Sequence, residues 1–326
     1  MKITFLILFI SFNLTLIAQK NKTIDSTAIQ SFRLKKVCYS DIGFNTAPFS
    51  LKFKDSIGNK EHLFYRNNLR SVFGIGFSYK WFSLRLAINL PGHLKPVSKF
   101  GETKYIDLGL EFKTKRHFYD IDFHNYKGYA IKNAYYWNDS LDKNINPHFI
   151  TQEMNALSLS LNTWRFFNKS INMSALKGKT AMYLKEEKSF YLKTTFNLHG
   201  VGNNGTLIPI EKFNPKNSKT SASTISAFDF GVLPGYVYVN RFKNWQYSGM
   251  LGLGPVIQSK FYYVDGIQRG YLGLAPRIDV RILFGYNVPR WFINFITEFD
   301  NKSIKFNNLK YQQTFYLIKL IGGIRF

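Results

Sequence analysis

SVFGIGFSYKWFSLRLAINL, residues 71–90, carries the pattern that decides the fold. Its apolar side chains stand at every second position as far as Trp81, and again from Phe82 onward. Small or polar residues such as Gly74 and Arg85 occupy the positions between them. Because successive side chains of a strand point to opposite faces, each half predicts a β-strand with one apolar face. The change of phase between Trp81 and Phe82 predicts a tight turn.

The same alternation recurs along most of the chain. Apolar stripes without a charge start near residues 106, 157, 190, 228, 251, 272, 291 and 316. The opposite faces mix glycine, serine, alanine and asparagine with charges of both signs, as the polar lumen of a membrane barrel does. In a soluble β-sandwich, which also alternates, these faces would be uniformly solvent-like. We expect about twelve strands, many of about ten residues, the length that crosses a bilayer when tilted.

The predicted connections alternate in length. Tight turns are expected near 81–82, 113–116, 241–244 and 287–290, and long polar loops near 54–69, 91–102, 129–150, 201–224, 259–268 and 301–311. Short turns at one rim and long loops at the other are typical of outer-membrane barrels. The sequence therefore predicts an all-β, closed antiparallel transmembrane β-barrel. Only residues 167–186 break this rhythm, since a short turn is expected there.

The N-terminus predicts export. Residues 1–18 combine Lys2, an apolar stretch and Ala18, which is the pattern of a cleaved signal peptide; an uncleaved anchor helix is the alternative. We expect residues 19–40 to form an N-terminal periplasmic or lumen segment, and 41–326 to form the barrel in the cell outer membrane.

The last apolar stripe ends on Phe326. Outer-membrane barrels commonly end in a strand whose final aromatic faces lipid at the periplasmic rim, where the assembly machinery engages it, and we expect Phe326 to lie there. We expect that machinery, together with outer-membrane lipid and lipopolysaccharide, to be the partners of the barrel. No pattern indicates the oligomeric state.

The composition is aromatic and basic, with 17% Phe, Trp and Tyr and a formal net charge of +24. Such a charge is consistent with an anionic membrane surface, with nucleic acid or with compositional bias. Nucleic acid is not an expected partner, because the chain has no recognition motif and no concentrated basic run. The single cysteine, Cys38, excludes an internal disulfide, and its role is not predicted.

The candidate site is a set of charged residues on the inward faces of the predicted strands. It comprises Asp107, Glu111, Asp120, Asp122, His124, Arg277 and Arg281. Acids and bases that share a lumen are expected to pair, since buried charges need partners. Clustered carboxylates and a histidine are also the residue types of a metal or proton site or of an ion-selective passage. We favour a structural charge network and predict no metal and no cofactor.

Aromatic residues near the predicted short turns form a second set. Tryptophan prefers the boundary between membrane and water. We expect a rim of aromatic side chains on the short-turn side, made of Trp81, Trp164, Trp245, Trp291 and Phe326.

Several stretches, in this order and spacing, resemble an outer-membrane family of Bacteroidota catalogued as the domain of unknown function 4421 family. They are FGIGFSYKWFSLRLAINLPG, TKYIDLGLEFKTKRHFYDIDFHNYKGY, FDFGVLPGYVYV, GLGPVIQ, LAPRIDVRILFGYN and the terminal IGGIRF. The resemblance implies a signal peptide and a membrane barrel. It implies no activity and no functional residue.

Two kinds of function remain for such a barrel. One is a plugged structural or interaction barrel, and the other is a small-solute pore. An outer-membrane enzyme, such as a lipid hydrolase or an acyltransferase-like barrel, is the alternative. We do not expect an enzyme, because the lipid-facing stripes offer few hydroxyls and no histidine for a nucleophile and its base.

Overall fold

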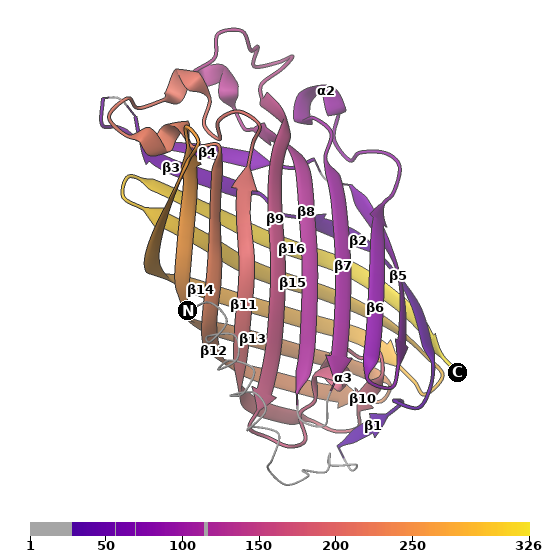
Figure 1. The fold of residues 1–326 in the computed structure, drawn as a ribbon. Helices are drawn as coiled ribbons and strands as arrows, with labels where there is room; N and C mark the ends of the chain where they lie inside the picture. Colours follow the sequence, from indigo (N-terminus) through magenta and orange to yellow (C-terminus); the bar gives the residue numbers. More distant parts are fainter. Residues whose placement is uncertain (1–27, 56, 69, 114–116) are drawn as a thin grey trace.

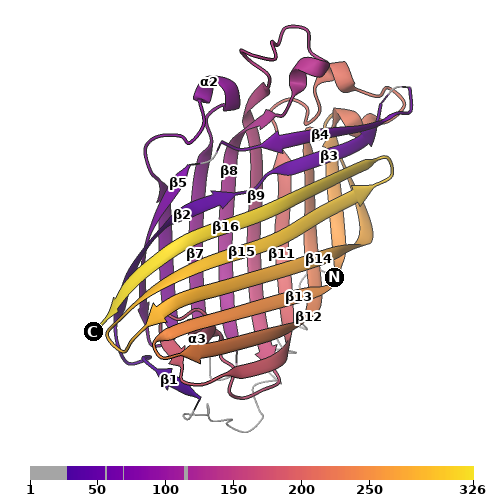
Figure 2. The same ribbon diagram turned by 180° about the vertical axis from the view of Figure 1, so that it is seen from behind.

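The computed structural model describes residues 28–55, 57–68, 70–113 and 117–326. The expected signal peptide and the turn at 114–116 lie outside these residues. Within them, twelve antiparallel strands form a closed ring in the order β2-β5-β6-β7-β8-β9-β11-β12-β13-β14-β15-β16 (Figures 1 and 2). Their bounds are β2 Val37–Thr46, β5 Ser71–Tyr79, β6 Phe82–Asn89, β7 Lys104–Lys113, β8 Phe118–Ile131, β9 Phe149–Phe166, β11 Glu187–Gly202, β12 Thr224–Phe242, β13 Trp245–Val264, β14 Ile267–Asn287, β15 Trp291–Phe306 and β16 Leu309–Arg325. The predicted transmembrane β-barrel is confirmed.

The ring closes between its first and last strands. β2 pairs antiparallel with β16, from Val37 opposite Arg325 to Thr46 opposite Tyr316. β2 begins at Val37, so the expected boundary between residues 40 and 41 falls inside the first barrel strand.

Apolar side chains cover the outside of the ring, and polar ones line its inside. Ile75 and Leu251, on the predicted stripes, are 57% and 56% exposed, whereas the inward Asp41 and Asp107 are 2% and 1% exposed. An apolar face this exposed is stable when lipid covers it, as lipid covers the outside of a membrane barrel. None of the described helices is long and apolar enough to span a membrane.

The two rims differ as predicted. At the short-turn rim, Lys80 and Trp81 connect β5 to β6, Lys243 and Asn244 connect β12 to β13, and residues 288–290 connect β14 to β15. The opposite rim, which we call the loop rim, carries long segments that include α2 (Val97–Phe100), η2 (Ala134–Tyr136), η3 (Ile210–Lys212) and η4 (Ser218–Ser221).

The prediction of long loops near 259–268 and 301–311 at the loop rim is wrong. Asp265 and Gly266 alone connect β13 to β14, and Asn307 and Asn308 alone connect β15 to β16. Asp265, Gly266 and Asn308 have φ angles of 50°, 80° and 61°, as tight hairpin turns require. The strands extend beyond their apolar stripes, and the polar residues of these extensions resemble loop in sequence.

A hairpin closes part of the loop rim. β3 (Phe49–Lys54) pairs with Leu309–Gln313 of β16, and β4 (Lys60–Arg66) pairs with Ala130 and Ile131 of β8. Those partner residues lie beyond the parts of β16 and β8 that pair with β2 and β7. The hairpin thus bridges β16 and β8 past the ends of β2, β5, β6 and β7, where Figure 2 shows it crossing the barrel.

An apolar core fills the barrel behind this hairpin. Phe49 is its centre, with ring centroids 4.4 Å from Tyr65, 4.9 Å from Tyr129 and 5.4 Å from Tyr311. The Tyr65 hydroxyl donates to the carbonyl of Leu207 at 2.5 Å, which ties the segment between β11 and β12 to the same core. The lumen is therefore closed by packed side chains at the loop rim.

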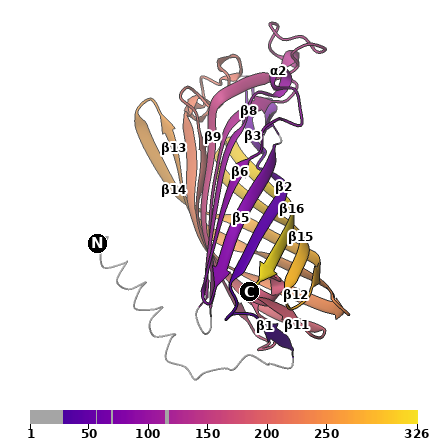
Figure 3. The same ribbon diagram turned by 90° about the vertical axis from the view of Figure 1, so that its right-hand side faces the viewer.

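Residues 167–186, which break the predicted rhythm, form a plug at the short-turn rim. They contain α3 (Met173–Leu176) and β10 (Ala181–Tyr183), and β10 pairs with β1 (Ile29–Ser31). Figure 3 shows β1 below the ring, and Figure 2 shows α3 behind its strands. The plug buries Met173, Ala175, Leu176 and Tyr183 against the inner wall. Both mouths of the barrel are thus filled.

Candidate functional site, a closed charged lumen

Between the apolar core and the plug lies a cavity of about 100 Å³. Its walls carry acids and bases from at least seven strands and from the plug, among them Arg85, Asp107, Glu298 and Lys319. A cavity of this volume and polarity has room for several water molecules. The site is therefore an enclosed charged chamber.

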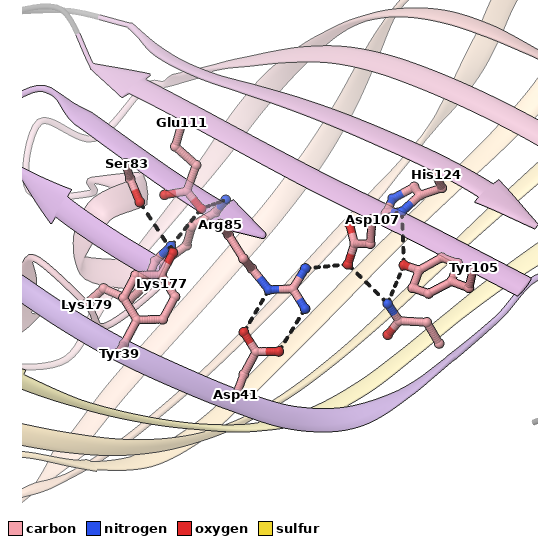
Figure 4. A network of polar contacts seen from close by, with 11 residues as sticks. Tyr39, Asp41, Ser83, Arg85, Tyr105, Asp107, Glu111, His124, Lys177 and Lys179 are labelled. Atoms are coloured by element: carbon pink, nitrogen blue, oxygen red, sulfur yellow. Dashed lines mark hydrogen bonds and ion pairs between the residues drawn. The ribbon is translucent and has the colours of Figure 1, made fainter. Parts of the chain in front are cut away.

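Arg85 of β6 joins two acids, one on the adjacent strand β7 and one on β2, which lies beyond β5 (Figure 4). Its Nε and Nη2 donate to the two carboxylate oxygens of Asp41 on β2, both at 2.7 Å. Its Nη1 pairs with Asp107 on β7. This bidentate geometry is the strongest that a guanidinium forms with a carboxylate. Gly74 leaves the space for Asp41, since a Cβ there would lie 2.6 Å from Oδ2 of Asp41.

His124 and Tyr105 complete the surroundings of Asp107. His124 Nδ1 lies 3.3 Å from Asp107 Oδ1 and 3.3 Å from the Tyr105 hydroxyl. Asn45 donates from Nδ2 to Asp107 Oδ2 at 3.2 Å and to the Tyr105 hydroxyl at 2.5 Å. The Asp107 carboxylate, which is almost completely buried, is therefore satisfied on both oxygens.

Two lysines of the plug bind acids of the wall. Lys177 Nζ and Lys179 Nζ each lie 2.8 Å from Glu111 (Figure 4). Lys177 Nζ also lies 2.6 Å from Asp120. Although burial lowers the pKa of Lys177, the carboxylates of Asp120 and Glu111 raise it more, so its pKa lies above the ordinary value. Lys177 is therefore charged at neutral pH, and the plug is held by ion pairs.

The backbone of the plug is fixed at Gly178. Its carbonyl accepts from Arg325 Nη2 at 2.8 Å and from Asn287 Nδ2 at 2.9 Å. Gly178 has a φ of 66°, and a Cβ there would lie 2.7 Å from Asn294 Nδ2. Both the left-handed conformation and the close approach require glycine at this position.

A second buried network lies around Asp229 of β12. The Asp229 carboxylate is 3.0 Å from His199 Nε2 and 3.1 Å from Arg277 Nη1, and it accepts from Gln258 at 2.8 Å. Arg277 also pairs with Asp300 at 3.1 Å. Each charge in this network has a partner of opposite sign, as burial requires.

The structure brings the charged residues expected from the sequence into the lumen, but in separate groups. Asp107 contacts both Arg85 and His124, while Glu111 and Asp120 contact lysines of the plug. Arg281 pairs with Glu298 at 3.1 Å and lies 3.8 Å from Asp120. Asp122 lines the cavity and forms no direct ion pair with the described residues. Arg277 belongs to the network around Asp229.

Sequence reasoning missed Asp41, Asp229, His199, Lys177 and Lys179 as members of these networks. Inward parity could have identified the two acids and the histidine. The two lysines could not be found, because nothing local shows that their segment folds back into the barrel. Among the described residues, no group of three or more His, Cys, Asp or Glu could hold a metal ion.

Three of the four rim tryptophans lie at the short-turn rim, as does Phe326. Trp81 and Trp245 are exposed there, and Trp291 is exposed and stacks on Tyr286. The prediction for Trp164 is wrong. It is 3% exposed and faces the lumen, where Lys193 lies 5.3 Å from its ring. The reason is parity: the outward positions of β9 are odd-numbered, so position 164 points inward.

Solved structures with a similar fold are outer-membrane barrels of several kinds. No curated protein matches the chain. In structure it is similar to the outer membrane protease OmpT from Escherichia coli, with 9% identity and a TM-score of 0.42 over 94% of this chain and 100% of that one. It is also similar to the translocator domain of the autotransporter NalP from Neisseria meningitidis, with 9% identity and a TM-score of 0.38 over 88% of each chain.

A third similar structure is the toluene transporter TodX of P. putida, with 8% identity and a TM-score of 0.29 over 89% of this chain and 90% of that one. These three proteins have different roles, so the likeness carries no activity to this one. A family model described as Domain of unknown function (DUF4421) matches residues 38–326, which is most of the chain, and the protein therefore belongs to that family.

Proposed function

We propose that this protein is a closed outer-membrane barrel with a structural or partner-binding role, whose lumen does not conduct in its resting state. The observation that carries the proposal is the double closure of the lumen. The core around Phe49 fills the barrel at the loop rim, and the plug fills it at the short-turn rim. The cavity between them measures only about 100 Å³, whereas a porin keeps a continuous aqueous channel.

The same architecture supports a location in the outer membrane. Outer-membrane barrels place their short turns in the periplasm and their long loops outside the cell. The hairpin β3–β4 and the segments around α2, η2, η3 and η4 then form an extracellular surface on a rigid support. Binding residues are often found on loops held in this way. Export by a cleaved signal peptide at residues 1–18 belongs to this proposal.

A small-solute pore is the second candidate, and the observation that favours it is the chemistry of the plug. The plug is joined to the wall by ion pairs of Lys177 and Lys179 as well as by apolar packing. Charged contacts of this kind can exchange with water, so displacement of the plug would leave a polar wall. The apolar core at the loop rim would still have to rearrange before solutes could pass.

An enzymatic role is not favoured. Among the described residues, the lumen histidines His124 and His199 pair with Asp107 and Asp229, and no serine hydroxyl hydrogen-bonds to either histidine. A nucleophile activated by a histidine needs such a bond.

Planar-bilayer recording on the purified protein tests the proposal. The full chain should give no steady single-channel current, because neither mouth is open. A variant that lacks the ammonium groups of the plug, K177Q/K179Q, should also give no steady current, because the apolar core around Phe49 still closes the loop rim. A steady current from the unmodified protein, similar to that of an open porin of matched strand number, would exclude the closed state and support the pore.

A further inference from the structure

A row of basic side chains crosses four strands on the outer face of the loop rim. Lys305 of β15 stands directly opposite Lys310 of β16, Lys310 opposite Lys52 of β3, and Lys52 opposite His62 of β4. We call these four residues the basic row. They face away from the lumen, because the residues that flank them in sequence are largely buried: Leu51, Phe53, Leu63, Ile304, Phe306, Leu309 and Tyr311.

The row has no acidic partner in the part of the chain that the structure describes. None of its three lysines forms an ion pair there. The nearby Glu61 is engaged with Lys212 at 3.0 Å, and Asp55 accepts from the amides of Ile57 and Asn59 at 3.0 Å and 2.7 Å. Like charges directly opposite one another destabilise a sheet. The three lysines of the row, which stand in register, therefore call for anions from outside the chain.

The position of the row indicates where those anions come from. On β16, the outward face runs from Lys310 through polar side chains to Tyr316, Ile318 and Leu320, which are 44%, 45% and 48% exposed. This exposed apolar face is the part of the strand in contact with hydrocarbon. The row stands beyond its end at the loop rim, on the side where lipid headgroups lie.

A groove beside the row has the amphipathic character of a lipid. It measures about 460 Å³, and its polar side carries Lys52 and His62 together with Arg66 and Lys95. The aromatic rings of Phe64 and Tyr316 also line it, with the Phe64 ring centroid 3.7 Å from that of His62, and Gln312 and Thr314 add hydrogen-bonding groups. Lysine and arginine bind phosphate oxygens, and the aromatic rings offer contact to an acyl chain.

We propose that the basic row and this groove bind the phosphate groups of lipids in the leaflet at the loop rim. The inference goes beyond the closed barrel proposed above, because it concerns the outer surface and holds for a conducting or a non-conducting lumen. On this inference, the basic side chains of this face hold phosphate-bearing lipids around the hairpin β3–β4.

Native mass spectrometry of the detergent-solubilised full chain tests this inference. The probe is a lipid with a phosphomonoester headgroup, and phosphatidylcholine of the same acyl chains is the comparison lipid. The unmodified protein should retain the phosphomonoester lipid preferentially. The variant K52Q/K305Q/K310Q should lose that preference by about tenfold or more, since each lysine beside an anionic lipid surface contributes several-fold.

Two further variants make the result specific. K36Q/K143Q/K216Q removes the same charge from exposed lysines outside the row and should bind like the unmodified protein. K52R/K305R/K310R keeps the charge and should also retain the lipid. The folding of each variant is checked by electrophoresis in denaturing detergent, in which a folded barrel stays folded unless the sample is heated. Equal retention by the glutamine variant and its control would overturn the proposal. Full displacement of the lipid by inorganic phosphate would overturn it too, by showing a site for free anions.

Discussion

The ammonium nitrogen of Lys177 lies 2.6 Å from a carboxylate oxygen of Asp120, and this ion pair fixes the plug to the wall of the barrel. Both side chains are almost completely buried. Removal of one partner leaves a buried charge without compensation, which typically costs about 3–5 kcal/mol.

Loss of this ammonium group should therefore destabilise the barrel. We expect K177Q to lower the free energy of unfolding by about 3 kcal/mol, at the lower end of that range because Arg281 and Lys179 remain near the acids. Denaturant titration followed by electrophoretic mobility measures this. The double variant K177Q/D120N should recover part of the loss, and K188Q, an exposed change on β11, should be neutral. Equal stability of K177Q and K188Q would contradict the ion-pair role.

The backbone of the plug should be sensitive at one glycine. G178A forces a side chain into a left-handed conformation, at about 1–2 kcal/mol, and toward Asn294. We expect the plug to become accessible to protease in detergent, with cleavage inside residues 167–186. G249A is the matched control, because a Cβ there meets nothing within 4 Å. The same protection pattern in both variants would show that the plug tolerates displacement at Gly178.

Arg85 should be more important to stability than any surface arginine. R85Q removes the guanidinium that pairs with Asp41 and Asp107. Although His124 and Asn45 remain beside Asp107, we expect a loss of about 3–5 kcal/mol in the free energy of unfolding. The triple variant R85Q/D41N/D107N removes the unpaired charges and should be more stable than R85Q alone. The comparison is made by thermal unfolding in one detergent. A triple variant less stable than R85Q would mean that the two acids stabilise the barrel mainly through partners other than Arg85, of which His124 beside Asp107 is one.

The tryptophans should divide into two groups by contact with lipid. In variants that keep a single tryptophan, lipids brominated near the headgroup should quench the fluorescence of Trp245 and Trp291. They should leave Trp164 unquenched, because its ring lies in the lumen between Lys193 and Arg281. Quenching of Trp164 equal to that of Trp245 would mean that Trp164 faces lipid and that the inward and outward positions of β9 are the reverse of those described.

The orientation in the membrane is testable with engineered cysteines in a background of C38S. Asn204, in the exposed segment between β11 and β12, should be labelled by an impermeant reagent on intact cells. Lys243, in the turn between β12 and β13, should be labelled only after the outer membrane is broken. The opposite pattern would place the short turns outside.

The barrel could be predicted from the sequence because its signal is local. Alternation within SVFGIGFSYKW is visible in eleven letters, and each strand repeats it. The inward position of Trp164 follows from the same alternation, because the stripe of Leu157, Leu159 and Leu161 places the odd-numbered positions outside. Proximity to a turn does not change this parity.

The plug and the hairpin could not be predicted, because their contacts are distant in sequence. Lys177 binds Glu111 and Asp120, and β4 binds the end of β8. No periodicity encodes such pairs. The two wrong loops near 259–268 and 301–311 have another cause: once a strand leaves the bilayer, its outward residues no longer need to be apolar.

The pairing of β2 with β16 sets an order of events in biogenesis. The first strand of the ring must remain unpaired on one edge until the last strand has been delivered, and an open edge invites association with other chains. The delay itself costs little, since the entropy of closing a long loop grows only with the logarithm of its length. β16 also carries Arg325, which donates to the plug at Gly178 and Lys179. Sealing of the ring and locking of the plug are thus completed by the arrival of one strand.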